Sequence, residues 1–190
     1  LAEKVLVFKF CTWFEEIELY LDPSSDLYTA FKYNYPNCYF QKFGFEHRKW
    51  VEENCEGVVL NLFAGKVKLN VEETRVDVDK NAYADLYMDA YEYVKLMIKR
   101  NVWFDTIILD PPYNVRKSRE KYGGRYIGSF TKIKNLLPKI LNTGGIVITL
   151  GYDSVGMSKS RGFEKISICL VCHNGDHNDT ICLKEIKETK

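Results

Sequence analysis

The chain has 190 residues, a length that suits one sizeable domain better than two. Hydrophobic residues make up 46% and charged residues 28% of it, as in soluble globular proteins, and no run of 18 apolar residues predicts a membrane span. The first residues, LAEKVLVFKF, lack the pattern of a secretory signal peptide. The net charge of +1 neither indicates nor excludes a nucleic-acid partner.

Residues 1–56 form an aromatic-rich opening section, in which the sequence predicts a helix at residues 45–54. From residue 57 the pattern becomes regular, and strand-like apolar runs alternate with segments of helical spacing. Strands are expected at residues 58–65, 73–79, 84–90, 104–110, 145–152, 163–173 and 179–187, and helices at 91–101 and 130–141. We therefore expect a core domain at residues 57–190, with residues 1–56 as an extension packed on it.

Strands that alternate with helices predict an open α/β sheet whose strands are mainly parallel. In such a sheet, ligands bind at the carboxyl ends of the strands. Candidate site residues stand at four expected strand ends: Asn61 to Gly65, Asp77, Asp89, and Asp110 to Asn114. The sequence therefore predicts a binding or catalytic site at this edge of the sheet.

The segment DPPYN, residues 110–114, directly follows a strand with a continuous apolar centre, FDTIIL. Neither proline has an N–H group, and each favours an extended backbone in the preceding residue, so Pro112 helps to stiffen the loop. Asp110 and the carbonyl of Pro111 would each accept one N–H of an amino group, while Tyr113 would stack on its flat ring. Asn114 would help to order the loop. The alternative is a rigid strand exit with a capping aspartate.

This segment matches the [DNS]-PP-[YFW] motif, and residues 57 to about 187 resemble the class I S-adenosylmethionine-dependent amino-methyltransferases. The resemblance implies a Rossmann-like, mainly parallel sheet with a C-terminal antiparallel hairpin strand. It also implies S-adenosylmethionine as cofactor, no metal, and methyl transfer to an exocyclic amine. The implied catalytic residues are Asp110, Pro111, Pro112 and Tyr113.

The same resemblance assigns residues to the cofactor. The segment Asn61 to Gly65 would hold its methionine part, Asp77 or its competitor Asp79 would bind the ribose hydroxyls, and Asp89 would read the adenine. The expected cofactor-binding residues are Asn61, Phe63, Ala64, Gly65, Asp77 and Asp89. The alternative for each aspartate is a solvated strand end.

The glycine loop departs from the family pattern. Val67 stands where a second glycine is usual, and about eight residues separate Gly65 from the next strand. This spacing holds one helical turn at most, so the helix that normally faces the cofactor's carboxylate is expected to be short or absent. Lys66 or Lys68 would then supply the positive charge.

Residues 116–139 carry eight lysines and arginines against one glutamate. Such clusters attract backbone phosphates, and tyrosines between them stack on bases. The expected substrate-binding residues are Asn114, Arg116, Lys117, Arg119, Tyr122, Arg125 and Tyr126. The alternative, a solvated basic helix face, accounts best for Lys132, Lys134 and Lys139.

Six cysteines are too few for a disulfide scaffold in a chain of this length. Cys169, Cys172 and His173, with His177 and Cys182 beyond them, have some ligand types of a zinc site. However, Cys169 and Cys172 lie in a strand-like run, where positions three apart point to opposite faces. We therefore expect reduced thiols in a cytoplasmic protein.

The resemblance favours a DNA adenine-N6 methyltransferase. The chain has no room for a dedicated target-recognition domain, so a partner subunit is one expected source of sequence selection. An RNA methyltransferase that acts on adenine or guanine amines is the first alternative, and protein glutamine methylation fits the basic loop less well. A non-catalytic nucleic-acid-binding module with the same fold is the alternative from another class.

Overall fold

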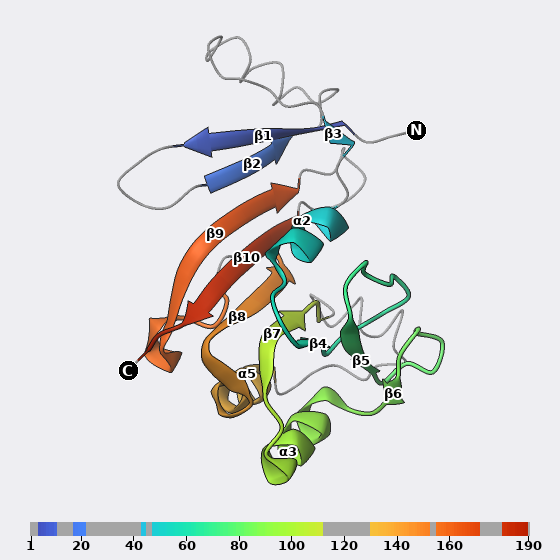
Figure 1. Ribbon diagram of the computed structural model, residues 1–190. Helices are drawn as coiled ribbons and strands as arrows, with labels where there is room; N and C mark the ends of the chain where they lie inside the picture. Colours follow the sequence, from blue (N-terminus) through green and yellow to red (C-terminus); the bar gives the residue numbers. More distant parts are fainter. Residues whose placement is uncertain are drawn as a thin grey trace.

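The computed structural model of the protein describes residues 4–10, 17–21, 43–44, 47–111, 130–152, 155–171 and 180–189 (Figure 1). The strands are β1 (Lys4–Phe10), β2 (Ile17–Leu21), β3 (Phe43–Gly44), β4 (Val59–Asn61), β5 (Glu73–Asp77), β6 (Leu86–Tyr87), β7 (Phe104–Leu109), β8 (Leu141–Gly151), β9 (Phe163–Val171) and β10 (Thr180–Lys187). The helices are α2 (His47–Asn54), α3 (Ala90–Arg100) and α5 (Phe130–Leu136), with the 3-10 turns η1 (Leu137–Lys139) and η2 (Lys159–Arg161).

All of these strands belong to one sheet, in the order β3-β1-β2-β9-β10-β8-β7-β4-β5-β6. The neighbours from β8 through β7, β4 and β5 to β6 are parallel. Strand β10 runs antiparallel to both β8 and β9. These pairings confirm the mainly parallel sheet with an antiparallel strand near the C-terminus. Strand β2 extends the sheet by pairing in parallel with β9.

Both faces of the central strands are covered, which explains the continuous apolar run of β7. On one face, Ile107 and Leu109 pack in a core with α3 and α5, two helices that lie close together in Figure 1. On the other face, Ile108 packs with Trp50 and Val51 of α2. Alternate residues of β7 thus point to opposite cores, as the period of a strand requires.

Several boundaries differ from the sequence prediction. The first core strand ends at Asn61 rather than residue 65, and the third is reduced to Leu86–Tyr87. Helix α5 ends before Pro138, which lacks the N–H that an α-helix needs, and the 3-10 turn η1 follows. Strand β8 begins at Leu141, four residues before its expected start.

Among the helices of the described residues, none is long and apolar enough to cross a membrane. Helix α2 belongs to the expected N-terminal extension, and its buried side chains Trp50 and Val51 pack on the sheet. The boundary between residues 56 and 57 stays a prediction.

Candidate cofactor and acceptor site

The four expected polar segments meet at one edge of the sheet. Strands β6, β5, β4 and β7 are parallel neighbours, so their carboxyl ends lie side by side. Asn61 is the last residue of β4 and Asp77 the last of β5, while Asp89 and Asp110 follow β6 and β7. The sheet order therefore brings together these residues, which are dispersed over 50 positions of the sequence.

The glycine loop after β4 is fixed by its backbone. The N–H of Ala64 donates to the carbonyl of Val76 at 3.2 Å, and the N–H of Gly65 donates to Oδ2 of Asp77 at 2.9 Å. Gly65 has a φ of +55°, a conformation that favours glycine. A Cβ placed on it would meet no atom of the described residues within 4 Å, so with respect to these residues the loop faces open space there.

A buried ion pair lies beneath this loop. The side chains of Glu73 and Arg75 are 1% and 4% exposed and contact each other directly. The guanidinium also donates to the carbonyl oxygens of Ala64 at 2.7 Å and Gly65 at 3.3 Å, and to that of Tyr83. Arg75 therefore ties the glycine loop to the segment that follows β5.

The Glu73 carboxylate holds the other side of the same connection. It accepts the amide Nδ2 of Asn61 at 3.0 Å and the N–H of Leu69 at 3.2 Å. Residues 62–72 contain no helix, as the short spacing predicts, and these charged hydrogen bonds stabilise the connection instead. This pair was not predicted, although opposite charges at alternate positions of the strand ETRVD place both side chains on one face.

The orientation of the Asn61 amide follows from its partner. An ionised carboxylate only accepts hydrogen bonds, so the nitrogen must face Glu73 and the oxygen must point away. The Oδ1 of Asn61 is buried and has no hydrogen-bond partner within the described parts of the chain. A buried acceptor without a donor is unusual, and it suits a ligand N–H at the end of β4.

The Asp77 side chain is 6% exposed, and both of its oxygens accept backbone N–H groups. Oδ2 accepts from Gly65 and Oδ1 accepts from Asp79 at 2.8 Å. A carboxylate has about four acceptor positions, so Asp77 keeps capacity for ligand hydroxyls. Its competitor Asp79 accepts from Asn81 in the following turn.

Asp89 caps helix α3. Its Oδ1 accepts the N–H groups of Tyr91 at 2.9 Å and Glu92 at 3.1 Å, which satisfies two donors of the first helical turn. This helix cap is a sufficient reason for an aspartate at position 89, and no ligand contact is needed to account for it. Its expected contact with adenine stays a prediction.

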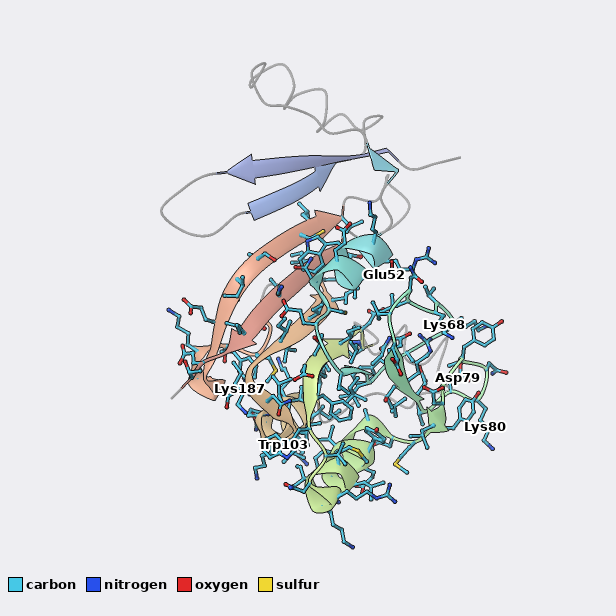
Figure 2. The ribbon with its side chains drawn as sticks, in the orientation of Figure 1. Glu52, Lys68, Asp79, Lys80, Trp103 and Lys187 are labelled. Atoms are coloured by element: carbon cyan, nitrogen blue, oxygen red, sulfur yellow. The ribbon has the colours of Figure 1, made fainter. Side chains whose placement is uncertain are left out.

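Two lysines follow Gly65 in the sequence. Lys66 and Lys68 are both exposed, and Figure 2 shows Lys68 on the connection between β4 and β5. Arg75 is not available to a ligand in the same way, because its guanidinium is buried and its N–H groups face protein oxygens.

On the acceptor side of the site, Asp110 is exposed directly after β7 and Pro111 is buried. Phe63 of the glycine loop packs edge-on against Phe130 at the start of α5, with ring centroids 6.3 Å apart. The glycine loop thus contacts the helix that follows the expected acceptor loop. The remaining expected acceptor residues lie outside the described residues: Pro112, Tyr113, Asn114, Arg116, Lys117, Arg119, Tyr122, Arg125 and Tyr126.

Lys134 does not belong to a solvated helix face. It is 9% exposed, its ammonium donates to the carbonyl of Gly156 at 2.9 Å, and it lies 4.9 Å from the Phe130 ring centroid. Its charge is thus used inside the protein, between α5 and the segment before η2.

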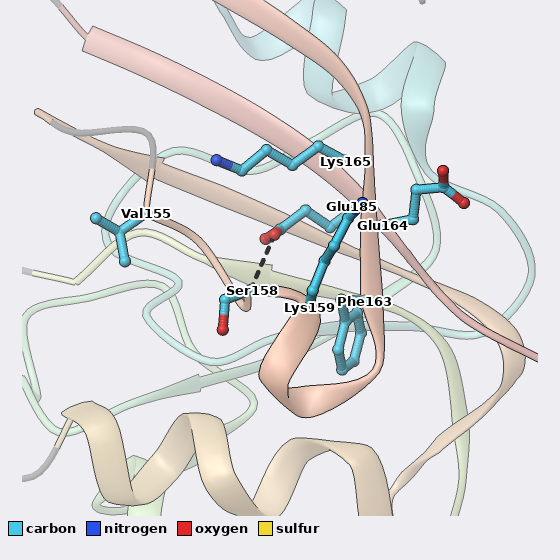
Figure 3. A pocket seen from close by; sticks show the side chains of 7 residues that line it. All are labelled: Val155, Ser158, Lys159, Phe163, Glu164, Lys165 and Glu185. Carbon is cyan, nitrogen blue, oxygen red and sulfur yellow. Dashed lines mark hydrogen bonds between the residues drawn. The ribbon is translucent and has the colours of Figure 1, made fainter.

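A separate hollow of about 360 Å³ lies beside that segment (Figure 3). Its buried carboxylate, Glu185, accepts the N–H groups of Met157 at 2.6 Å and Ser158 at 3.2 Å. A Cβ on Gly156 would lie 2.1 Å from Oε2 of Glu185, so this close approach requires glycine. Glu185 therefore has a structural role, and none of the seven residues that line the hollow belongs to the expected site.

The thiol of Cys55 is influenced by the charge of Glu73. Burial and, to a smaller extent, the negative charge of Glu73 together raise the pKa of the Cys55 thiol to about 12. Cys169 and Cys182 are buried and lie opposite each other on β9 and β10. In the described part of the chain, no three potential metal ligands are grouped, whereas Cys172, His173 and His177 lie outside that part.

Comparison with known proteins gave similarity in structure only. No protein-family model and no curated protein matches the sequence. A protein from Streptococcus mutans assigned as a SAM-dependent methyltransferase superposes with a TM-score of 0.54 at 15% identity, over 90% of this chain and 69% of that one. SMU.776, assigned as a methyltransferase and solved with SAH, gives 0.53 at 15% identity over the same shares. The chain therefore has the Rossmann-like α/β fold of these two proteins, with β10 antiparallel between β8 and β9.

Proposed function

We propose that the chain is an S-adenosylmethionine-dependent methyltransferase that acts on the exocyclic amine of a nucleobase. The observation that carries the proposal is the hydrogen bond between the N–H of Gly65 and the carboxylate of Asp77, beside open space at the ends of β4 and β5. Strand β4 is the direct neighbour of β7, after which Asp110 follows. The structural similarity to a protein solved with SAH supports this cofactor.

The residues around Gly65 fit such a cofactor. The unpartnered Oδ1 of Asn61 suits its amino group, and the remaining acceptor positions of Asp77 suit its ribose hydroxyls. Lys66 and Lys68 are the cations that we assign to its carboxylate. When bound, S-adenosylmethionine supplies a methyl group on a positively charged sulfur.

Asp110 and the carbonyl of Pro111 would bind and orient the acceptor amine. The lone pair of an aromatic amine is delocalised into its ring, so the amine is a poor nucleophile. Oxygens that accept its hydrogens stabilise the positive charge that develops on nitrogen during transfer. Positioning supplies much of the remaining catalysis. Asp110 would later help a proton to leave.

For the acceptor, we favour adenine N6 in DNA, and RNA amines are the alternative. The basic composition of residues 116–129 supports a nucleic acid of either kind. A base within a duplex must be flipped out before it reaches Asp110, and Tyr113 would then stack on it. Sequence selection would come from residues 1–56, from the basic segment or from a partner subunit.

Transfer of tritiated methyl groups from S-adenosylmethionine to DNA, RNA and protein tests the proposal. We expect label in a nucleic-acid pool, and Asp110→Ala should abolish transfer while cofactor binding, measured by isothermal titration, stays intact. Absence of both transfer and cofactor binding in the wild-type chain would refute the proposal. Nucleic-acid binding without transfer, unchanged in Asp110→Ala, would instead support the non-catalytic module.

A further inference from the structure

Thr149 is a polar residue in an otherwise apolar part of β8. Residues 146–150 read IVITL, and the Thr149 side chain is 8% exposed. Its Oγ1 is buried and has no hydrogen-bond partner among the described residues, where only Asn61 Oδ1 shares this property. An unpartnered buried hydroxyl is unfavourable by about 1–3 kcal/mol relative to a satisfied one, so the position requires an explanation.

The position of Thr149 in the sheet relates it to the expected acceptor. It pairs with Leu109, the residue directly before Asp110, and with Leu183 on its other side. Residues in register on parallel strands point to the same face, and Leu109 belongs to the core that contains α5. Thr149 thus lies on the α5 face, next to the strand end that carries Asp110.

The two sides of β7 differ in what they present. All residues expected to bind the cofactor lie on or after β4, β5 and β6, on one side of β7, whereas β8 lies on the other. Methyl donor and acceptor must meet at Asp110, so the acceptor approaches from the β8 side. Thr149 is the buried polar side chain that β8 offers there.

We propose that the Thr149 hydroxyl is an acceptor-binding group, which hydrogen-bonds the heterocycle whose exocyclic amine binds Asp110 and Pro111. This inference rests on the proposed function. A hydroxyl both donates and accepts, so it can pair with the ring nitrogen beside the amine of the base. The hydroxyl is then buried without a protein partner because the substrate supplies its hydrogen bond.

Thr149→Val tests the inference, because valine has the same shape without the hydroxyl. We expect kcat/KM for the nucleic-acid acceptor to fall about three- to tenfold, the value of one neutral hydrogen bond, with unchanged affinity for S-adenosylmethionine. The Tm should not fall, because no protein hydrogen bond is lost. Thr149→Ser, which keeps the hydroxyl, should retain most of kcat/KM.

Thr106→Val is the matched control. Thr106 is also a buried strand threonine, but its Oγ1 donates to the carbonyl of Glu56 at 2.7 Å and accepts its N–H at 2.9 Å. This variant should lower the Tm by about 2–8 °C and leave kcat/KM unchanged below its transition.

The outcomes separate the two proposals. A Thr149→Val protein that keeps kcat/KM within twofold, or that loses stability as Thr106→Val does, overturns the role of Thr149 while the methyltransferase proposal stands. A wild-type chain that transfers no methyl group to nucleic acid overturns both.

Discussion

Replacing Arg75 with methionine tests whether the buried ion pair holds the glycine loop. The substitution keeps an unbranched side chain and removes the charge from a residue whose guanidinium contacts Glu73, Ala64, Gly65 and Tyr83. It leaves the Glu73 carboxylate buried, with only the Asn61 and Leu69 donors to balance it.

Removal of one partner from a buried ion pair destabilises a protein by about 3–5 kcal/mol, because the other charge stays buried without compensation. For a chain of this size, that loss corresponds to a fall in Tm of about 6–20 °C. Chemical denaturation should give the free energy directly. The affinity for S-adenosylmethionine should fall as well, because the carbonyls of the glycine loop lose their donor.

Lys95→Met is the matched control for Arg75→Met. The Lys95 ammonium lies 3.1 Å from Glu92, but both side chains are more than half exposed, so its loss should change stability by less than about 0.5 kcal/mol. Adding Glu73→Gln to Arg75→Met should restore part of the lost stability, since the unpaired charge is removed. A loss below 1 kcal/mol for Arg75→Met, or no recovery in the double variant, would refute this account of the loop.

Gly65→Ala should lower stability by only about 1 kcal/mol, because alanine disfavours the left-handed backbone of this position. It should nevertheless reduce the affinity for the cofactor at least tenfold in isothermal titration, because the added methyl group enters the open space of the site. Equal affinities of the variant and the wild type would place the cofactor elsewhere. The pKa of Cys55 is raised from 9.0 to about 12, so folding favours its protonated thiol and stability should decline as the pH rises from about 9 towards 12. Urea unfolding at pH 8 and 10.5 should show a smaller decline for Cys55→Ala, and equal declines would contradict it. Hydrogen bonds from Val58 and Asn142 lower the pKa of Asp105. The ionised carboxylate should therefore contribute to the free energy of unfolding, by less than about 1 kcal/mol at this exposed site. This contribution is present above pH ~4 and is lost as the pH falls through the pKa of the folded state. Asp105→Ala should therefore differ from the wild type at pH 6 but not under strongly acidic conditions, and a constant difference would count against this.

The central sheet could be predicted from the sequence because its strands are covered on both faces. Ile107 to Leu109, at the centre of FDTIIL and its end, form the continuous apolar run that such burial favours, and the polar residues after the strands mark the carboxyl edge. The absence of a helix between β4 and β5 also followed from the sequence, because about eight residues cannot span a helix and its turns. Asp77 and Gly65, 12 positions apart, meet as the fold class implies.

The remaining features of the fold and the site depend on contacts within the chain that no local sequence pattern reveals. Strand β2 pairs with β9, which lies about 150 residues further along the chain, and β1 joins the sheet through β2. The charge pattern of ETRVD shows that Glu73 and Arg75 share a face, but not that a loop folds over them. Asp89 illustrates the converse, because a strand-end acid that predicts a ligand contact also makes a helix cap.

The ion pair beneath the glycine loop determines where a cofactor carboxylate can bind. In a loop followed by a helix, backbone N–H groups at the helix start bind an anion, and this connection has no such helix. Arg75 is a buried cation beneath the loop, but Glu73 neutralises it and the loop carbonyls occupy its donors. We therefore expect the charge to come from Lys66 or Lys68, which are exposed. Because exposed charges are screened by salt whereas helix N–H groups that contact an anion are much less so, we expect the affinity of this chain for S-adenosylmethionine to fall as the ionic strength rises.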